Sequence, residues 1–411
     1  MKKTWIPCTA ACLVALAPSG AGAFTGDVGD IAVIEDTTGA IHATIMIPPS
    51  FCQETAKVFY LSHPDDFDSI VAFTTKNLDF LSNVYQGTPV RNGTEGIGMI
   101  IFDQTASYGS AGRLQNCVKM GKITGLPDDP DTSSPLTYHL TGIEILAHEY
   151  SHLWLLWLNY DKNDGLGERD LLRGYEDGAN GHWNYYADSH SVMYGNCVTD
   201  LGGGSFELAG CPRGYNTLEL YAFGLVGPDA VEPVWFVDIG EPHGEPSLPL
   251  AIGQTAAVSG TKVEVTLDDV MRVHGARVPT VDTSQKLFRV AFVLVSEAGV
   301  EAPPDLIAKV DTYRGRFEAW FSSATGGTGS LDTRLRIDAA EEGAPEDLVE
   351  EDVPEAGEEP SDETADVQVE EESIPEGQDA AADDAAEPDG PAEDGDGGGC
   401  GCRIVSVERG P

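Results

Sequence analysis

Two histidines and a glutamate stand at a spacing that suits metal chemistry. His148, Glu149 and His152 form an H-E-x-x-H pattern within residues 145–154. On a helix, residues four apart lie on one face, so both imidazoles can reach one zinc ion. Glu149 then lies beside the metal, where it can accept a proton from a zinc-bound water. The pattern therefore predicts a hydrolytic zinc site.

The surrounding residues predict that this pattern lies on a long buried helix. Apolar side chains recur at helical spacing, and the helix is expected to continue to about Tyr160; these side chains are Ile143, Leu146, Ala147, Leu153, Trp154, Leu156 and Trp157. Unpaired buried polar groups are costly, so buried histidines and a glutamate favour a metal site. Because the pattern is short, an amphipathic helix with two surface histidines is the alternative.

A third ligand must come from elsewhere, since a catalytic zinc usually has three protein ligands. The compact extension of the pattern is absent, because Leu155 and Leu158 stand where its glycine and last histidine would be. His182 follows His152 by 30 positions, lies between a glycine and a tryptophan, and is the predicted ligand. The alternatives are Glu219, Glu176, Asp188 and His190. Glu219, the strongest of them, could instead be a buried acid that anchors its helix.

Three more residues are candidates for supporting roles. Tyr194, in the run Ser-Val-Met-Tyr-Gly-Asn, could donate a hydrogen bond to the oxyanion of a tetrahedral intermediate, or be purely structural. Met193 in the same run could lie under the metal, although an isolated methionine is more often part of a core. Glu144 lies four residues before His148 and could orient that imidazole, or remain solvated.

The order of these motifs resembles the metzincin branch of the zincin metallopeptidases. A zinc helix, a distant histidine, a Ser-x-Met turn and an acidic helix at Leu218–Tyr221 follow one another. The chain is also similar to poorly characterised secreted metallopeptidases of bacteria over about residues 55–335, with the specific motifs in 143–225. It departs from metzincins in its remote third histidine and in Tyr194, which directly follows the methionine.

The resemblance implies an α+β, zincin-like catalytic domain with a mixed sheet and a β-containing extension. It implies Zn²⁺ as cofactor and a protein or peptide substrate, with Glu149 as general base. A non-catalytic surface protein with a structural zinc, and a zinc amidase acting on cell-wall peptides, are the alternative functions. The fold further implies that a strand borders the cleft, and Gly96–Phe102 is the expected segment.

The N-terminus predicts export. Residues 1–23 combine two lysines, an apolar stretch and small residues before Phe24, as in a signal peptide. In an exported chain the four cysteines of residues 24–340 predict two disulfides; they are Cys52, Cys117, Cys197 and Cys211. The simplest pairing joins Cys197 to Cys211, which closes a short glycine-rich loop, and leaves Cys52 to pair with Cys117. A second zinc site is the alternative use of these cysteines.

Residues 24–340 are long enough for one large domain or two lobes. Strands are expected at 31–33, 41–47, 70–74, 97–102, 262–267 and 287–295, and helices at 54–60 and 305–321. The polar run Asp161–Gly165 is a weak candidate for Ca²⁺.

The C-terminal part of the sequence has a different composition. No lysine or arginine occurs between Arg336 and Arg403, and residues 341–399 are predicted to be a disordered acidic linker. The formal net charge of −44 argues against binding nucleic acid. Residues 400–411 contain Cys400-Gly401-Cys402, which resembles the sorting tail of myxobacterial surface proteins without its apolar span. We therefore expect no transmembrane span, and release or attachment through Cys400 or Cys402.

Overall fold

The structure is a computed structural model that describes residues 22–42, 50–78, 85–133, 139–155, 157–173, 181–240 and 249–336. These residues belong to one compact unit. The predicted signal peptide, apart from its last two residues, and the predicted acidic linker and Cys-Gly-Cys tail lie outside the described residues.

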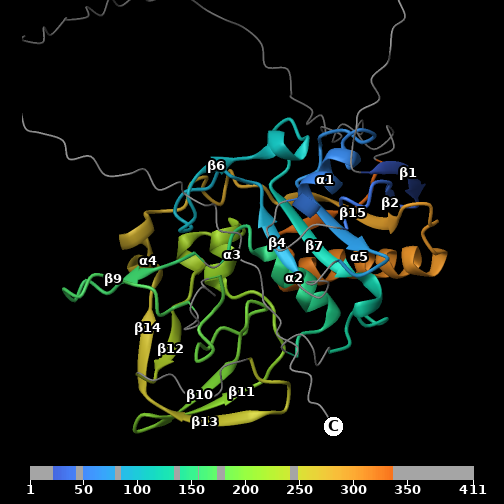
Figure 1. Cartoon of the computed structure of the whole chain (residues 1–411). Coiled ribbons are helices and arrows are strands. Elements are labelled where there is room, and N and C mark those ends of the chain that lie inside the picture. Colours follow the sequence, from blue (N-terminus) through green and yellow to red (C-terminus); the bar gives the residue numbers. More distant parts are fainter. Residues whose placement is uncertain are drawn as a thin grey trace, which may run out of the picture. The chain divides into compact units, whose positions relative to one another are not determined.

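A mixed seven-stranded sheet is the largest element of the fold (Figure 1). Its strand order is β1-β2-β15-β3-β7-β4, and β16 pairs with β15. Strands β2, β15, β3 and β7 run parallel, whereas β1 and β4 are antiparallel edge strands. The bounds are β1 Ala23–Val28, β2 Ile31–Asp36, β3 Ser69–Thr74, β4 Gln86–Pro89, β7 Asn116–Lys122, β15 Leu287–Glu297 and β16 Ser330–Asp332. The expected α+β class with a mixed sheet is confirmed.

Helices cover both faces of this sheet. Side chains of the central strand β15 alternate: Phe292 and Leu294 join the core with α2 (Gly142–Ser151) and α5 (Pro304–Ala324), whereas Val293 joins the core with α1 (Ser50–Phe59). Successive side chains of a strand point to opposite faces, so a strand buried on both faces is apolar throughout. The sequence of β15 accordingly shows a continuous apolar run and no alternation of apolar and polar residues.

Smaller sheets and two short helices form the middle of the chain. Figure 1 shows β10, β11 and β13 together, with β12 and β14 beside them. The bounds are β10 Cys197–Gly202, β11 Ser205–Ala209, β13 Thr255–Ser259, β12 Val234–Asp238, β14 Thr261–Val265, β8 Tyr160–Asp161, β9 Glu168–Arg169, α3 Thr217–Phe223 and α4 Leu267–His274. Among the described residues, short 3₁₀ helices lie at Thr105–Tyr108, Ile123–Gly125 and Pro228–Ala230.

The strand expected at residues 97–102 is wrong. Only β6 (Phe102–Asp103) is a strand there, and it pairs with β5 (Arg91–Asn92) outside the main sheet. Gly96 and Gly98 have φ angles of +77° and +80°, a left-handed conformation that no regular strand contains. The edge strand beside α2 is β4 instead, so the expected cleft-bordering role of Gly96–Phe102 is not supported. Of the strand expected at 41–47, only residues 41–42 are described, and they lie in a turn.

The two predicted disulfides are confirmed. Cys52 of α1 is bonded to Cys117 of β7, and Cys197 is bonded to Cys211 across the β10–β11 hairpin. Within the described ranges, no helix is long and apolar enough to cross a membrane.

Candidate metal centre

Helix α2 presents the H-E-x-x-H residues and begins with a reciprocal cap. The Glu144 N–H donates to Thr141 Oγ1, and the Thr141 N–H donates to Glu144 Oε2 at 2.8 Å. Such a cap satisfies two backbone N–H groups that a helix start otherwise leaves unpaired. The structure therefore uses the Glu144 carboxylate at the helix start and does not give it the role of orienting His148.

Helix α2 ends earlier than its apolar pattern predicted. Ser151 is its last residue and His152 is its C-cap, so the expected continuation to Tyr160 is wrong. The N–H groups of Trp154 and Leu155 both donate to the Ser151 carbonyl, which closes the helix with a tight turn. The turn brings the Trp154 ring to 4.6 Å from that of Phe223, in the core. Leu153, Trp154 and Leu155 are thus buried in a turn that follows the helix, and not in a longer helix.

The three predicted histidines lie together in the interior. His148 Nε2 is 3.2 Å from His182 Nε2, and one nitrogen of each ring lies within 4.8 Å of the others. Tetrahedral zinc with nitrogens at 2.0–2.1 Å sets them about 3.3 Å apart. The set therefore fits a metal ion with small adjustments of His152.

Burial determines the protonation of this cluster. It lowers the pKa of His148 to about 4, and it holds the pKa of His152 well below its ordinary value, with His148 adding to the effect. His148 Nδ1–H donates to the Val192 carbonyl at 2.8 Å, which leaves Nε2 as the lone-pair atom of the neutral ring. Neither ring nitrogen of His152 has a hydrogen-bond partner among the described residues. A buried nitrogen without a partner is costly, and a metal ion would satisfy it.

Glu149 is buried beside the cluster and is held by strand β4. Its Oε2 accepts the Gly87 N–H at 2.7 Å and lies 3.9 Å from His152 Nε2. A side chain at Gly87 is impossible without movement, because a Cβ there would lie 1.9 Å from the Glu149 carbonyl oxygen. Burial raises the pKa of Tyr85 to about 12 and lowers that of Lys119, and the charge of Glu149 raises both.

Sequence reasoning missed Gly87, Tyr85 and Lys119 as neighbours of Glu149. The segment around Gly87 carries no motif, and its contact with α2 joins residues 62 positions apart. Its only sequence signal is a glycine in a short run before Pro89, which is too weak to identify a contact.

The turn that contains Met193 follows His182 in the sequence and is hydrogen-bonded to the residue next to His182. The Trp183 N–H donates to the Met193 carbonyl at 3.0 Å, and the Met193 N–H donates to Ser191 Oγ at 2.9 Å. The turn requires Gly195, since a Cβ there would lie 2.0 Å from the Ser191 nitrogen. Met193 is fully buried in the same core as α2.

Tyr194 follows in this turn with a φ of +73°, which is unusual for a residue with a side chain. Its ring stacks on His182 with centroids 4.2 Å apart and lies 4.7 Å from the ring of His148. The structure thus brings Tyr194 to the cluster, in contact with two of the three predicted ligands.

Glu219 is buried but is not part of the gathered ligand set. It accepts from Trp183 Nε1–H, from Ser191 Oγ–H and from the Asn216 N–H. Burial raises its pKa to about 7, against the effect of these hydrogen bonds. Glu219 therefore ties α3 to the His182 loop and to the turn, as a buried anchoring acid does.

The other alternative ligands lie elsewhere. Glu176 is outside the described residues, and Asp188 Oδ1 lies 3.1 Å from His190 Nε2. His190 belongs to a second group with Cys197 and Cys211, and the described part of the chain holds no further group of three or more such side chains. The run Asp161–Gly165 gathers no such ligand set, and Asp164 is ion-paired with Arg169. Nothing in this run therefore supports the Ca²⁺ expectation.

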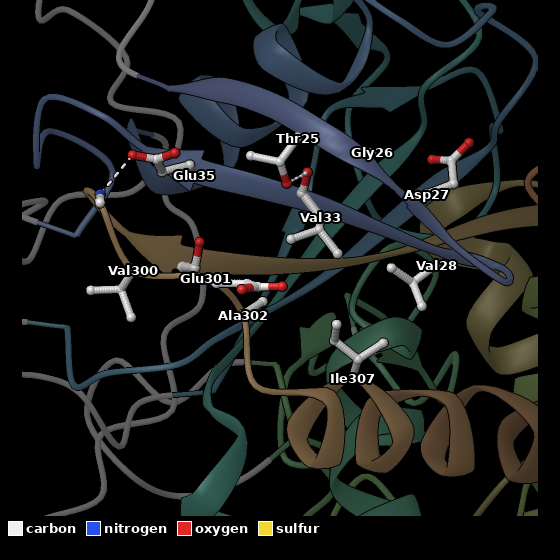
Figure 2. Close-up of a pocket in the computed structure, with 12 residues that line it drawn as sticks. Thr25, Gly26, Asp27, Val28, Val33, Glu35, Val300, Glu301, Ala302 and Ile307 are labelled. Carbon is white, nitrogen blue, oxygen red and sulfur yellow. Dashed lines mark hydrogen bonds between the residues drawn. The ribbon is translucent and has the colours of Figure 1, made fainter.

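Figure 2 shows residues that line a hollow of about 500 Å³. The β1–β2 hairpin, the end of β15 and the start of α5 form its walls. Three acidic side chains and several apolar ones line it; the acids are Asp27, Glu35 and Glu301. None of the predicted site residues lines this hollow.

Comparison with known proteins adds no assignment. No protein-family model, no curated protein and no solved structure matches this chain. The histidine cluster is therefore interpreted from its own residues.

Proposed function

We propose that this chain is a zinc-dependent endopeptidase in which His148, His152 and His182 hold the metal and Glu149 is the general base. The observation that carries the proposal is the convergence of three buried imidazoles beside a buried carboxylate. The three nitrogens lie within 4.8 Å of one another, and Glu149 Oε2 is 3.9 Å from His152 Nε2.

The roles of the chain's own groups follow from their contacts. When bound, zinc would polarise a peptide carbonyl and lower the pKa of a water molecule. Glu149 accepts the proton of the attacking water and delivers it to the leaving amine. The Gly87 N–H holds the Glu149 carboxylate in place, and the Val192 carbonyl orients His148. Tyr194, which packs on His182, is proposed to donate a hydrogen bond to the oxyanion.

The architecture supports a metzincin-like version of this proposal. The motif helix lies against an antiparallel edge strand of a mixed sheet, and the Ser-x-Met turn contacts the first histidine through Val192. Two disulfides agree with a secreted or cell-surface location, because disulfides persist in oxidising compartments. The proposed substrate is accordingly an extracellular protein or peptide.

Burial of the cluster favours one alternative function. His148, His152 and His182 are only 2%, 0% and 6% exposed, as in a closed structural zinc site. A structural site has no use for a general base, whereas Glu149 is held beside the histidines. The peptidase proposal uses all four residues and is therefore preferred.

Hydrolysis of casein tests the proposal. Glu149→Gln should lower the rate by about 10²–10⁴-fold, the usual contribution of a general base, while zinc is retained. Glu144→Gln is the matched control, because it changes another buried glutamate of α2 that only caps the helix. The control should keep its activity per folded molecule. Full activity of Glu149→Gln would contradict the proposal. So would bound zinc without activity in the wild type and in both variants.

A further inference from the structure

His190, Cys197 and Cys211 form a second group of metal-capable side chains, separate from the proposed centre. His190 Nδ1 lies 3.2 Å from Cys197 Sγ and 4.0 Å from Cys211 Sγ. The two sulfurs are bonded to each other, and a disulfide is a poor metal ligand because zinc binds thiolates. The group can therefore bind a metal only after reduction.

We propose that reduction of the Cys197–Cys211 disulfide creates a second zinc site made of both thiolates and His190. A dithiol reductant supplies two electrons and two protons, and is itself oxidised to a disulfide, as the Cys197–Cys211 bond breaks. Zinc then displaces the two thiol protons and binds both sulfurs and His190 Nδ1. Zinc replaces the disulfide as the cross-link of the hairpin.

The geometry of the group suits this exchange. In tetrahedral zinc sites, with Zn–S near 2.3 Å and Zn–N near 2.0 Å, nitrogen and sulfur lie about 3.5 Å apart. The two observed distances, 3.2 Å and 4.0 Å, lie on either side of that value. The sulfurs must only separate to about 3.8 Å, which rotation of the side chains allows.

The backbone keeps the ligands in place without the disulfide. Strands β10 and β11 pair from Cys197 with Ala209 to Gly202 with Ser205, so the hairpin persists after reduction. The His190 N–H donates to the Asn196 carbonyl, and the His190 carbonyl accepts the Gly214 N–H. His190 also has a φ of +50°, a costly conformation that these contacts maintain.

Asp188 fixes the ring in the form that a metal requires. Its Oδ1 lies 3.1 Å from His190 Nε2 and also accepts the Val198 N–H at 2.8 Å. The neutral ring then carries its proton on Nε2, and the Nδ1 lone pair faces the sulfurs. Histidine ligands of zinc commonly donate their other N–H to a carboxylate in this way.

The test counts zinc bound per chain by dialysis and metal analysis, before and after reduction with a dithiol. It uses the full chain with Cys8, Cys12, Cys400 and Cys402 replaced by serine, so that only the two disulfides supply thiols. Reduction should add one zinc per chain. His190→Ala should weaken the added site by at least about 10-fold, and Asp188→Asn by about 10–100-fold.

Two outcomes overturn the proposal. One is no gain of zinc on reduction, and the other is a gain that His190→Ala leaves unchanged, which would mean unspecific thiolate binding. Cobalt(II) gives a second readout, since thiolate-to-cobalt absorption should appear only in the reduced protein. The reduced Cys197→Ser/Cys211→Ser variant should lose this absorption, although it keeps His190 and the Cys52–Cys117 pair. The result does not depend on the peptidase activity.

Discussion

The group around His148 and the group around His190 both contact the segment 190–192, but the first is buried and the second is largely exposed. His148 is 2% exposed, and burial lowers its pKa to about 4. The His190 side chain is 55% exposed, and its hydrogen bond to Asp188 raises its pKa. Val192 accepts a hydrogen bond from the first ring, and His190 precedes it by only two residues. Environment, and not proximity in sequence, therefore decides the chemistry of each histidine.

The comparison shows what prepares an imidazole to bind a metal. In the buried group, burial lowers the pKa of His148 and His152, which favours their neutral, metal-binding form, and Glu149 lies 3.9 Å from His152 Nε2. In the exposed group a carboxylate holds one nitrogen while a disulfide occupies the ligand positions. The first group is ready in the oxidised protein, whereas the second depends on reduction.

The largest expected effect separates the two groups directly. In the oxidised protein His182→Ala removes one of the three proposed ligands, so zinc affinity should fall by more than the 10–100-fold lost when a supporting contact is removed. His190→Ala should leave that affinity unchanged. Competition with a chromogenic chelator measures both. Equal losses of zinc affinity in the two variants would contradict the assignment of His182, and not His190, to the buried metal centre.

A second change tests the packing that holds Glu149. Gly87→Ala places a Cβ 1.9 Å from the Glu149 carbonyl oxygen, so we expect a loss of about 1–3 kcal/mol in the free energy of unfolding. Gly93→Ala is the control, because no atom lies within 4 Å of its added Cβ. Urea unfolding measures both variants. Equal stability of Gly87→Ala and Gly93→Ala would show that β4 does not constrain α2.

Part of the site and of the fold could be predicted from local sequence patterns. The spacing of His148 and His152 predicted their common face because it depends only on local helix geometry. His182 was predicted from its flanking residues, and its approach to His148 depends on the Met193 turn and on Glu219. The strand pattern of β15 was recognisable because a strand buried on both faces is apolar throughout.

Contacts between distant segments could not be predicted. The end of α2 is set by packing of Trp154 on Phe223, which the apolar pattern of the helix does not reveal. The contact between Gly87 and Glu149 likewise depends on how β4 lies beside α2. The Gly96–Phe102 run was apolar enough for a strand, but its glycines adopt conformations that only the folded chain discloses.

The smallest expected effect concerns the buried anchor Glu219. Its pKa in the folded protein is raised to about 7, whereas the ordinary value is 4.5. Between these values the folded state holds more protons than the unfolded state, so this group's contribution to stability is lost as pH rises from about 4.5 to 7. Glu219→Gln should therefore reduce the loss of stability over that window. Glu207→Gln, on β11, controls for net charge, and an unchanged pH dependence in Glu219→Gln would refute the prediction.

X-ray absorption at the zinc edge of the oxidised, zinc-loaded protein tests whether His148, His152 and His182 hold the metal. We expect about one zinc per chain, three histidine nitrogens at 2.0–2.1 Å and no sulfur scatterer. Sulfur at about 2.3 Å would place the metal at the cysteine group, and a protein that binds no zinc would contradict the proposed centre altogether.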